Sequence, residues 1–172
     1  FRRVLFRSRP AIGRPIIEPA DGMYPFQPWA REFSALLAVN HRKPSRPEYL
    51  DPVSRGFQDG LPRANWNGFE ISQQKDQVTF LYDYFHSFRV VPTDGRPPLP
   101  SQVKLWMGSS RGRWEGNTLV VEVDNLNDQG WLDIVGGFHS DALRLEERWT
   151  RVAANHLKYV VKMSDPKVFT RP

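Results

Sequence analysis

The sequence contains no cysteine among its 172 residues, and this absence removes several classes of protein at once. Disulfide-stapled scaffolds, thiol catalysis and cysteine-ligated zinc sites all require that residue. No apolar run approaches the ~20 residues of a membrane-spanning helix, and no phosphate-loop, dinucleotide, serine-elbow or zinc-protease motif is present. What remains is one globular domain with 40% hydrophobic and 13% aromatic residues, too apolar for a disordered chain.

The formal net charge of +5 arises from one end of the chain. Residues 1–14 contain five arginines and no acidic residue, and the rest of the chain holds 19 Lys and Arg against 19 Asp and Glu. A neutral body lacks the basic surface that nucleic-acid binding needs. We therefore predict no nucleic-acid partner and no membrane insertion, and no pattern indicates a cofactor or a metal.

Both ends of the chain have unusual sequences. Residues 1–8, FRRVLFRS, resemble a translated sequencing adapter, so we predict that 1–14 is a non-native or disordered arm. A native basic arm is the alternative. Residues 167–170 are strand-like and lie two residues before the last one, and we expect the native protein to continue beyond residue 172.

Proline and hydrophobic patterns divide the chain into a wrap and a β domain. Residues 15–68 are rich in proline and glycine, which favour irregular chain. An amphipathic helix over about 28–41 interrupts them, with Trp29, Phe33, Leu36, Leu37 and Asn40 at the spacing of one helical face. Across 69–172, alternation predicts strands at 69–73, 78–86, 88–91, 103–107, 119–125, 142–152 and 156–163, with a hairpin tip at Gly116 and Asn117.

The register of the last two predicted strands can be checked from the sequence. A three-residue loop over 153–155 pairs Val152 with His156, and the same register pairs Trp149 with Tyr159, Glu147 with Val161 and Leu145 with Met163. Their apolar faces then lie on one side of the sheet and charged residues on the other. Such strands predict a mainly β fold, either an antiparallel up-and-down barrel of the calycin or lipocalin kind or a strongly curved sheet.

Four segments resemble a group of uncharacterised, exported proteins of environmental bacteria. They are PIIEPADG at 15–22, KLWMGSSRGRWEGNTLVV at 104–121, FHSDAL at 138–143 and DPKVFTRP at 165–172. The resemblance covers nearly everything after residue 14. It implies a periplasmic or extracellular protein whose signal peptide is missing from this sequence, with further strands after residue 172, and it implies no reaction.

Glu147 is the most informative candidate for function, because alternation turns it toward the apolar face between Leu145 and Trp149. Burying an ionised carboxylate costs several kcal/mol unless it is paired or protonated. The position therefore indicates either a functional acid or base with a raised pKa, or a structural carboxylate that lies near a rim or pairs with an inward Arg or Tyr.

Three further residues complete the candidate catalytic set. His139 and Asp141 precede the 142–152 strand and point the same way in extended chain, and His86 shares a face with Tyr82 and Tyr84. If they converge with Glu147, they suit general acid–base catalysis. The alternatives are a strand-starting role for Asp141 and a satisfied core position for His86.

Aromatic and arginine side chains form the candidate ligand site. The predicted lining is Tyr82, Tyr84, Trp106, Arg111, Arg113, Trp114, Trp131, Trp149 and Tyr159. The two arginines suit a carboxylate or phosphate, or they are simply solvated. Small-molecule binding in an aromatic-lined pocket is the leading hypothesis. The alternatives are a lyase, isomerase or hydrolase in which Glu147 or His139 moves a proton, and a structural domain without a pocket.

Overall fold

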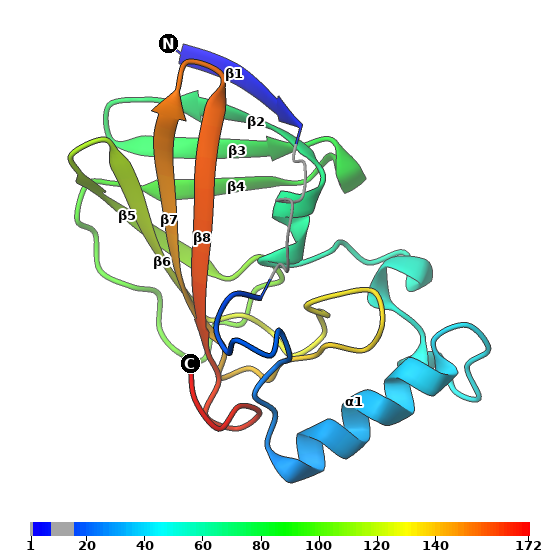
Figure 1. The fold of residues 1–172 in the computed structure, drawn as a ribbon. Helices are drawn as coiled ribbons and strands as arrows, with labels where there is room; N and C mark the ends of the chain where they lie inside the picture. Colours follow the sequence, from blue (N-terminus) through cyan, green and yellow to red (C-terminus); the bar gives the residue numbers. More distant parts are fainter. Residues whose placement is uncertain (1, 8–15) are drawn as a thin grey trace.

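The computed structural model describes residues 2–7 and 16–172, in which one α-helix accompanies two antiparallel sheets (Figure 1). Sheet 1 has the order β1-β2-β3-β4: Arg2–Arg7, Gly68–Gln73, Gln77–Tyr82 and Phe88–Pro92. Sheet 2 has the order β5-β6-β7-β8: Ser109–Glu115, Thr118–Asp124, Arg144–Ala153 and His156–Ser164. The helix α1 is Pro28–Asn40, and the 3-10 turns η1 to η4 are Pro47–Tyr49, Pro52–Arg55, Arg63–Trp66 and Tyr84–His86. The prediction of a mainly β fold with one N-terminal helix is confirmed.

The two sheets pack face to face, with the strands of sheet 1 running across those of sheet 2 (Figure 1). Alternate residues of each strand point inward and form the core. Sheet 1 contributes Phe69, Val78, Phe80, Tyr82 and Val91, and sheet 2 contributes Leu119, Val121, Val123, Leu145 and Trp149. The predicted inward set at 119, 121 and 123 is therefore confirmed.

The sheets approach each other most closely where β4 passes β5. A Cβ on Gly112 would lie 2.8 Å from Cγ1 of Val91 and 3.1 Å from Cγ2 of Thr93, so a side chain at this position would displace its neighbours. At the other side, β1 pairs only with β2 and β8 only with β7 among the described strands. The described strands consequently form two sheets and not one closed ring.

The β7–β8 hairpin has the predicted core register but a different turn. Trp149 pairs with Tyr159, Glu147 with Val161 and Leu145 with Met163, as expected. However, Ala153 pairs with His156, so the turn has two residues, and an irregularity between Arg151 and Ala153 contains the extra residue. The predicted Val152–His156 pair is wrong, and the bulge restores the register that the apolar face requires.

Two predicted strands differ from the structure. The 78–86 strand is wrong beyond Tyr82, because Phe85 (φ 57°) and His86 (φ 48°) adopt left-handed conformations and the amide of Tyr82 bonds the carbonyl of Ser87. That tight turn lets β4 return beside β3. The 103–107 segment is irregular, with one isolated bridge from Leu105 to Leu126.

Residues 2–7 of the N-terminal arm form a strand. Arg2–Arg7 forms β1 and pairs antiparallel with β2, from Arg2 opposite Gln73 to Arg7 opposite Gly68. That residues 1–14 are a non-native or disordered arm stays a prediction. The other residues of the predicted 1–14 arm lie outside the described part.

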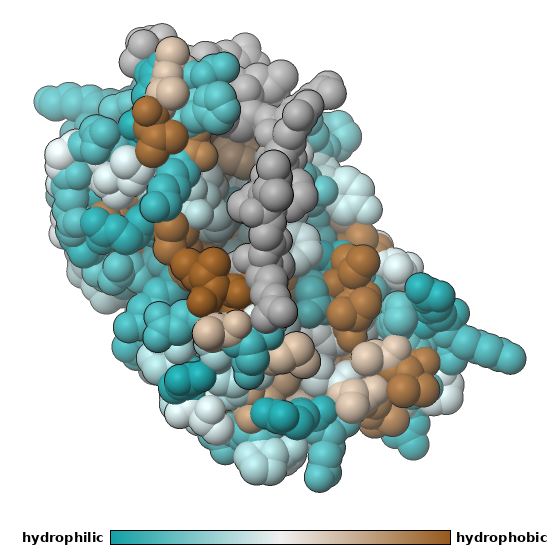
Figure 2. Space-filling model, viewed as in Figure 1, coloured by the Kyte–Doolittle hydropathy of each residue, from teal (hydrophilic) through white to brown (hydrophobic). Residues whose placement is uncertain are grey.

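The helix α1 buries a narrower face than its sequence predicts. Ala30 and Leu37 are buried, while Trp29, Phe33 and Leu36 are 51%, 38% and 41% exposed. Apolar surface gathers at the lower right of Figure 2, where Figure 1 places the helix. Within residues 2–7 and 16–172, no helix has both the length and the apolar character needed to cross a bilayer.

Candidate functional site

Glu147 lies in the middle of the inner face of sheet 2 and is completely buried. Its Oε2 accepts a hydrogen bond from Nη2 of Arg89 on β4 at 2.5 Å. Its Oε1 accepts from the hydroxyl of Tyr159 at 2.8 Å and from Nδ2 of Asn65 at 3.1 Å. The predicted inward orientation is confirmed, and the carboxylate has the arginine and tyrosine partners of the structural alternative.

These contacts extend into a buried polar network of Asn65, Tyr82, Arg89, Ser110, Glu147 and Tyr159. Tyr82 donates to Oδ1 of Asn65 at 2.9 Å, and Nε of Arg89 donates to Oγ of Ser110 at 2.7 Å. The network therefore connects η3 with the inner faces of both sheets. Nη1 of Arg89 has no hydrogen-bond partner among the described residues.

The network holds its charges in fixed states. Burial opposes a charge on Arg89, but the Glu147 carboxylate more than compensates and raises the pKa of Arg89 above its ordinary value. Burial raises the pKa of Tyr82 to about 12 and that of Tyr159 well above its ordinary value. Both tyrosines therefore remain neutral donors near neutral pH, beside an ion pair that spans the two sheets.

The two candidate histidines do not join Glu147. His86 is exposed on η4 and not on the inner face of β3, because the strand ends before it. His139 is buried in the connection between β6 and β7, with Nδ1 2.9 Å from the carbonyl oxygen of Ser140. The hydrogen bonds to Glu147 come from Asn65, Arg89 and Tyr159, so within the described residues the predicted convergence with imidazole is not found.

Asp141 also lies apart from His139. Its carboxylate contacts Nζ of Lys167 at 2.7 Å and Nζ of Lys104 at 3.7 Å, near the surface. The hydrogen bond from Lys167 is the main reason that the pKa of Asp141 is lowered. The two residues do not share a site.

His139 gives the first prediction, which concerns pH. Burial lowers its pKa below the ordinary 6.5, so the unfolded chain binds a proton that the folded protein resists. The contribution to stability is complete above pH 6.5 and is lost as the pH falls toward the folded pKa. Urea unfolding of the wild type and of His139→Gln at pH 7.5 and pH 5 should show a smaller loss in the variant. An equal loss would contradict the prediction, and His156→Gln, at an exposed site, is the control.

Arg111 and Arg113 lie on the outer face of sheet 2, away from the aromatic interior. Arg111 pairs with Asp124 at 2.8 Å, and Arg113 pairs with Glu122 at 2.8 Å. Both guanidinium groups therefore already have acidic partners at the surface, which agrees with the alternative that the two arginines are solvated. The structure thus gives neither arginine a place in a ligand pocket.

The predicted aromatic residues are divided between core, connection and surface. Trp149 and Tyr159 pack in a tilted arrangement with ring centroids 4.2 Å apart, and the ring centroid of Trp149 also lies 5.1 Å from that of Phe80. Trp131 is buried in the connection, while Tyr84 and Trp114 are 46% exposed. Of the rings expected to line an internal pocket, Tyr82, Trp149 and Tyr159 pack in the core with Phe80 instead.

Trp106 belongs to an open hollow on the surface, which we call the aromatic hollow. Its lining is Gly56, Phe57, Gln58, Phe85 and Trp106, and its volume is about 450 Å³. Phe57 and Trp106 stack with centroids 5.1 Å apart, and Nε1 of Trp106 donates to the carbonyl of Gln58 at 2.7 Å. Phe85 enters from η4, where the chain is left-handed. Sequence analysis identified Trp106 but not Phe57 or Phe85.

A charged cluster supports the wall that carries Phe57. Arg63 is 6% exposed and donates two bonds to Asp51, at 3.0 and 2.9 Å, and one to the carbonyl of Asp133 at 3.0 Å. Its Nε pairs with Asp59 at 2.9 Å, and Asn67 also donates to Asp59. Burial raises the pKa of Asp59, although Arg63 and Asn67 favour its ionised form. Sequence analysis missed this cluster, whose one local signal is the Asp51-Pro52 start of η2.

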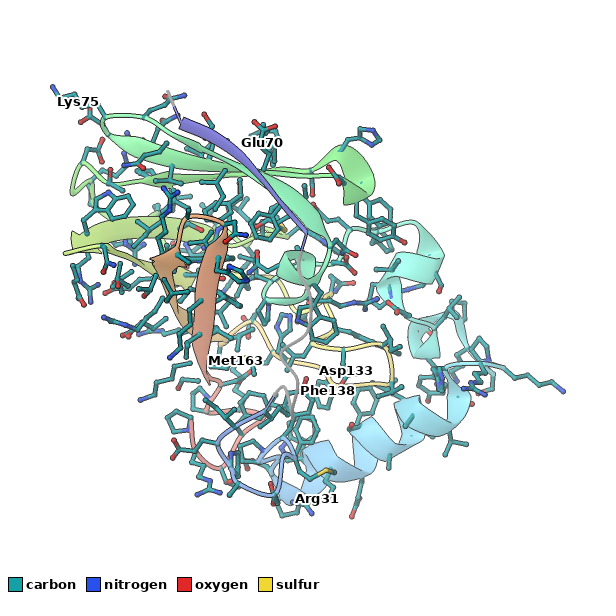
Figure 3. The ribbon with its side chains drawn as sticks, turned by 45° about the horizontal axis from the view of Figure 1, so that its top comes forward. Arg31, Glu70, Lys75, Asp133, Phe138 and Met163 are labelled. Atoms are coloured by element: carbon teal, nitrogen blue, oxygen red, sulfur yellow. The ribbon has the colours of Figure 1, made fainter. Side chains whose placement is uncertain are left out.

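The cluster ties the wrap to the connection between β6 and β7. Asp133 and Phe138 both lie in that connection, above α1 in Figure 3. Phe138 contacts the ring of Phe33 edge-on, with centroids 5.0 Å apart. Arg63 therefore attaches Asp51, at the start of η2, to the connection between β6 and β7.

Within the described residues, no group of three His, Asp or Glu side chains is arranged to hold a metal ion. Comparisons with protein-family models, with curated proteins and with solved structures found no match to this chain.

Proposed function

We propose that this protein binds a small, partly apolar molecule in the aromatic hollow. The observation that carries the proposal is the gathering of Phe57, Phe85 and Trp106, from three separate segments, around an open space of about 450 Å³. Ligand sites commonly have volumes of about 300–1,000 Å³ and aromatic linings. Phe57 and Phe85 are 45% and 39% exposed, so a ligand would remove apolar surface from water.

The walls of the hollow are held in place before any ligand arrives. Trp106 is fixed by its bond to Gln58, and η2 is fixed by Asp51, whose side chain accepts the amide of Val53 and two bonds from Arg63. Preorganised walls reduce the entropy lost on binding. Left-handed φ angles at Phe85 and His86 also mark η4 as a segment where local strain is kept, which is common at binding sites.

Binding is favoured over acid–base catalysis by the state of the buried polar network. A general acid or base must exchange a proton near the working pH. The tyrosines around Glu147 have raised pKa values, and Arg89 keeps its charge. We assign this network to the scaffold. We also propose that the fold is calycin-like, with the two sheets as the two halves of a barrel that meet at Gly112. An exported location, which the sequence resemblance implies, fits a binding protein.

Trp106→Leu should weaken binding of the neutral fluorescent probe N-phenyl-1-naphthylamine about tenfold, because a large stacking surface is lost. Trp114→Leu is the matched control, since Trp114 is 46% exposed on β5 and does not line the hollow. Fluorescence titrations, with circular dichroism to confirm folding, would measure both variants. No binding by the wild type, or equal losses in the two variants, would overturn the proposal.

A further inference from the structure

Arg55 lies at the end of η2, directly before two residues of the aromatic hollow, Gly56 and Phe57. Its guanidinium carbon is 5.3 Å from the centroid of the Phe57 ring, over that ring. Its Nε is buried and has no hydrogen-bond partner among the described residues. A guanidinium cation with one buried, unpaired donor therefore lies over Phe57, which forms one wall of the hollow.

Two acidic residues near this turn, Asp51 and Asp59, are already paired. Asp51 and Asp59 both bind Arg63, whose three contacts with them lie between 2.9 and 3.0 Å. Neither carboxylate is left to neutralise Arg55. The cationic group is consequently available to an anion from outside the chain, and guanidinium matches planar oxyanions such as carboxylates through parallel donors.

We infer that the ligand of the aromatic hollow is a planar aromatic molecule that carries a carboxylate or a similar oxyanion, an inference that rests on the proposed function. Phe57, Phe85 and Trp106 supply ring faces and edges for the aromatic part. Arg55 supplies the donors for the anionic part. The ring of Phe57 links the two parts of the site, since it lines the hollow and also contacts the guanidinium of Arg55.

The stacking geometry favours a flat ligand over a bulky one. The rings of Phe57 and Trp106 are 30° from parallel, with centroids 5.1 Å apart, so they form a stack whose outer surface a flat ligand can extend. The hydrogen bond from Trp106 to Gln58 prevents the indole from turning away. A flat ring placed against this surface gains contact over its whole area, whereas a branched aliphatic molecule touches it at few points.

The experiment compares 2-naphthoate with 2-naphthamide, which have nearly the same shape and differ in charge. Isothermal titration calorimetry at moderate salt would measure both probes on the wild-type chain, on Arg55→Gln and on Arg55→Lys. Arg144→Gln, at an exposed position on the outer face of β7, changes the net charge equally and is the control. Circular dichroism would confirm that each variant is folded.

We expect the wild type to bind 2-naphthoate about tenfold more tightly than 2-naphthamide, as one charge-assisted pair allows. Arg55→Gln should remove that preference without affecting 2-naphthamide, Arg55→Lys should keep part of it, and Arg144→Gln should change nothing. Equal affinity for the two probes, or a preference that survives Arg55→Gln, would overturn this inference and leave the proposed function intact. Failure of both probes to bind would overturn both.

Discussion

Replacing Arg89 with methionine should lower the free energy of unfolding by about 3–5 kcal/mol, because removal of one partner leaves a buried charge without compensation. Glu147 is completely buried, and Arg89 is its ionic partner from the opposite sheet. Asn65 and Tyr159 would still bond the carboxylate but carry no charge. Urea unfolding monitored by tryptophan fluorescence would measure the change.

The double variant Arg89→Met/Glu147→Leu separates the cost of an unpaired charge from the value of the pair. Apolar replacement of both partners is often nearly neutral, so the double variant should regain much of the lost stability. Arg96→Met is the surface control, because its pair with Asp94 is exposed and should contribute little. A double variant less stable than Arg89→Met would show that the pair does not act as a unit.

Replacing Arg63 with methionine should produce the second large effect, a loss of about 3 kcal/mol, since two nearly buried carboxylates would then face each other without a cation. Asp51 and Asp59 have 13% and 5% of their side-chain surface exposed in their pairs with Arg63. The same change should also weaken binding of aromatic probes, because η2 and Phe57 depend on this anchor.

Arg111→Met provides the comparison for that experiment. Arg111 also pairs with an aspartate, but its side chain is 22% exposed and lies on the outer face of sheet 2, away from the hollow. Its loss should cost less stability and leave probe binding unchanged. Arg63→Met that is folded, as stable as Arg111→Met and fully able to bind would contradict the role given to the cluster.

Local periodicity predicted the parts of this fold that depend on one strand and its neighbour. Leu119, Val121 and Val123 alternate inward because a half-buried strand must separate its two faces. The same rule oriented Glu147 correctly and paired Trp149 with Tyr159. The strand prediction was wrong for residues 83–86. Their aromatic residues favour a strand locally, but the turn at Phe85 overrides that preference.

Two partners of Glu147, Arg89 and Asn65, could not be found in this way, because they come from distant segments. Arg89 is 58 residues away and Asn65 is 82 residues away, and no local pattern links such positions. The aromatic hollow could not be predicted either, since Phe57 and Phe85 belong to irregular segments that carry no periodic signal. Strand patterns thus specify orientation, whereas the meeting of remote loops decides which side chains share a site.

Gly112 has a consequence for how this architecture can diversify. With a hydrogen atom where other residues carry carbon, it allows Val91 and Leu119 to close the corner between β4 and β5. Any larger residue there would have to displace the side chains of Val91, Thr93 and Leu119. Related proteins with more room between the sheets are therefore expected to differ at this position.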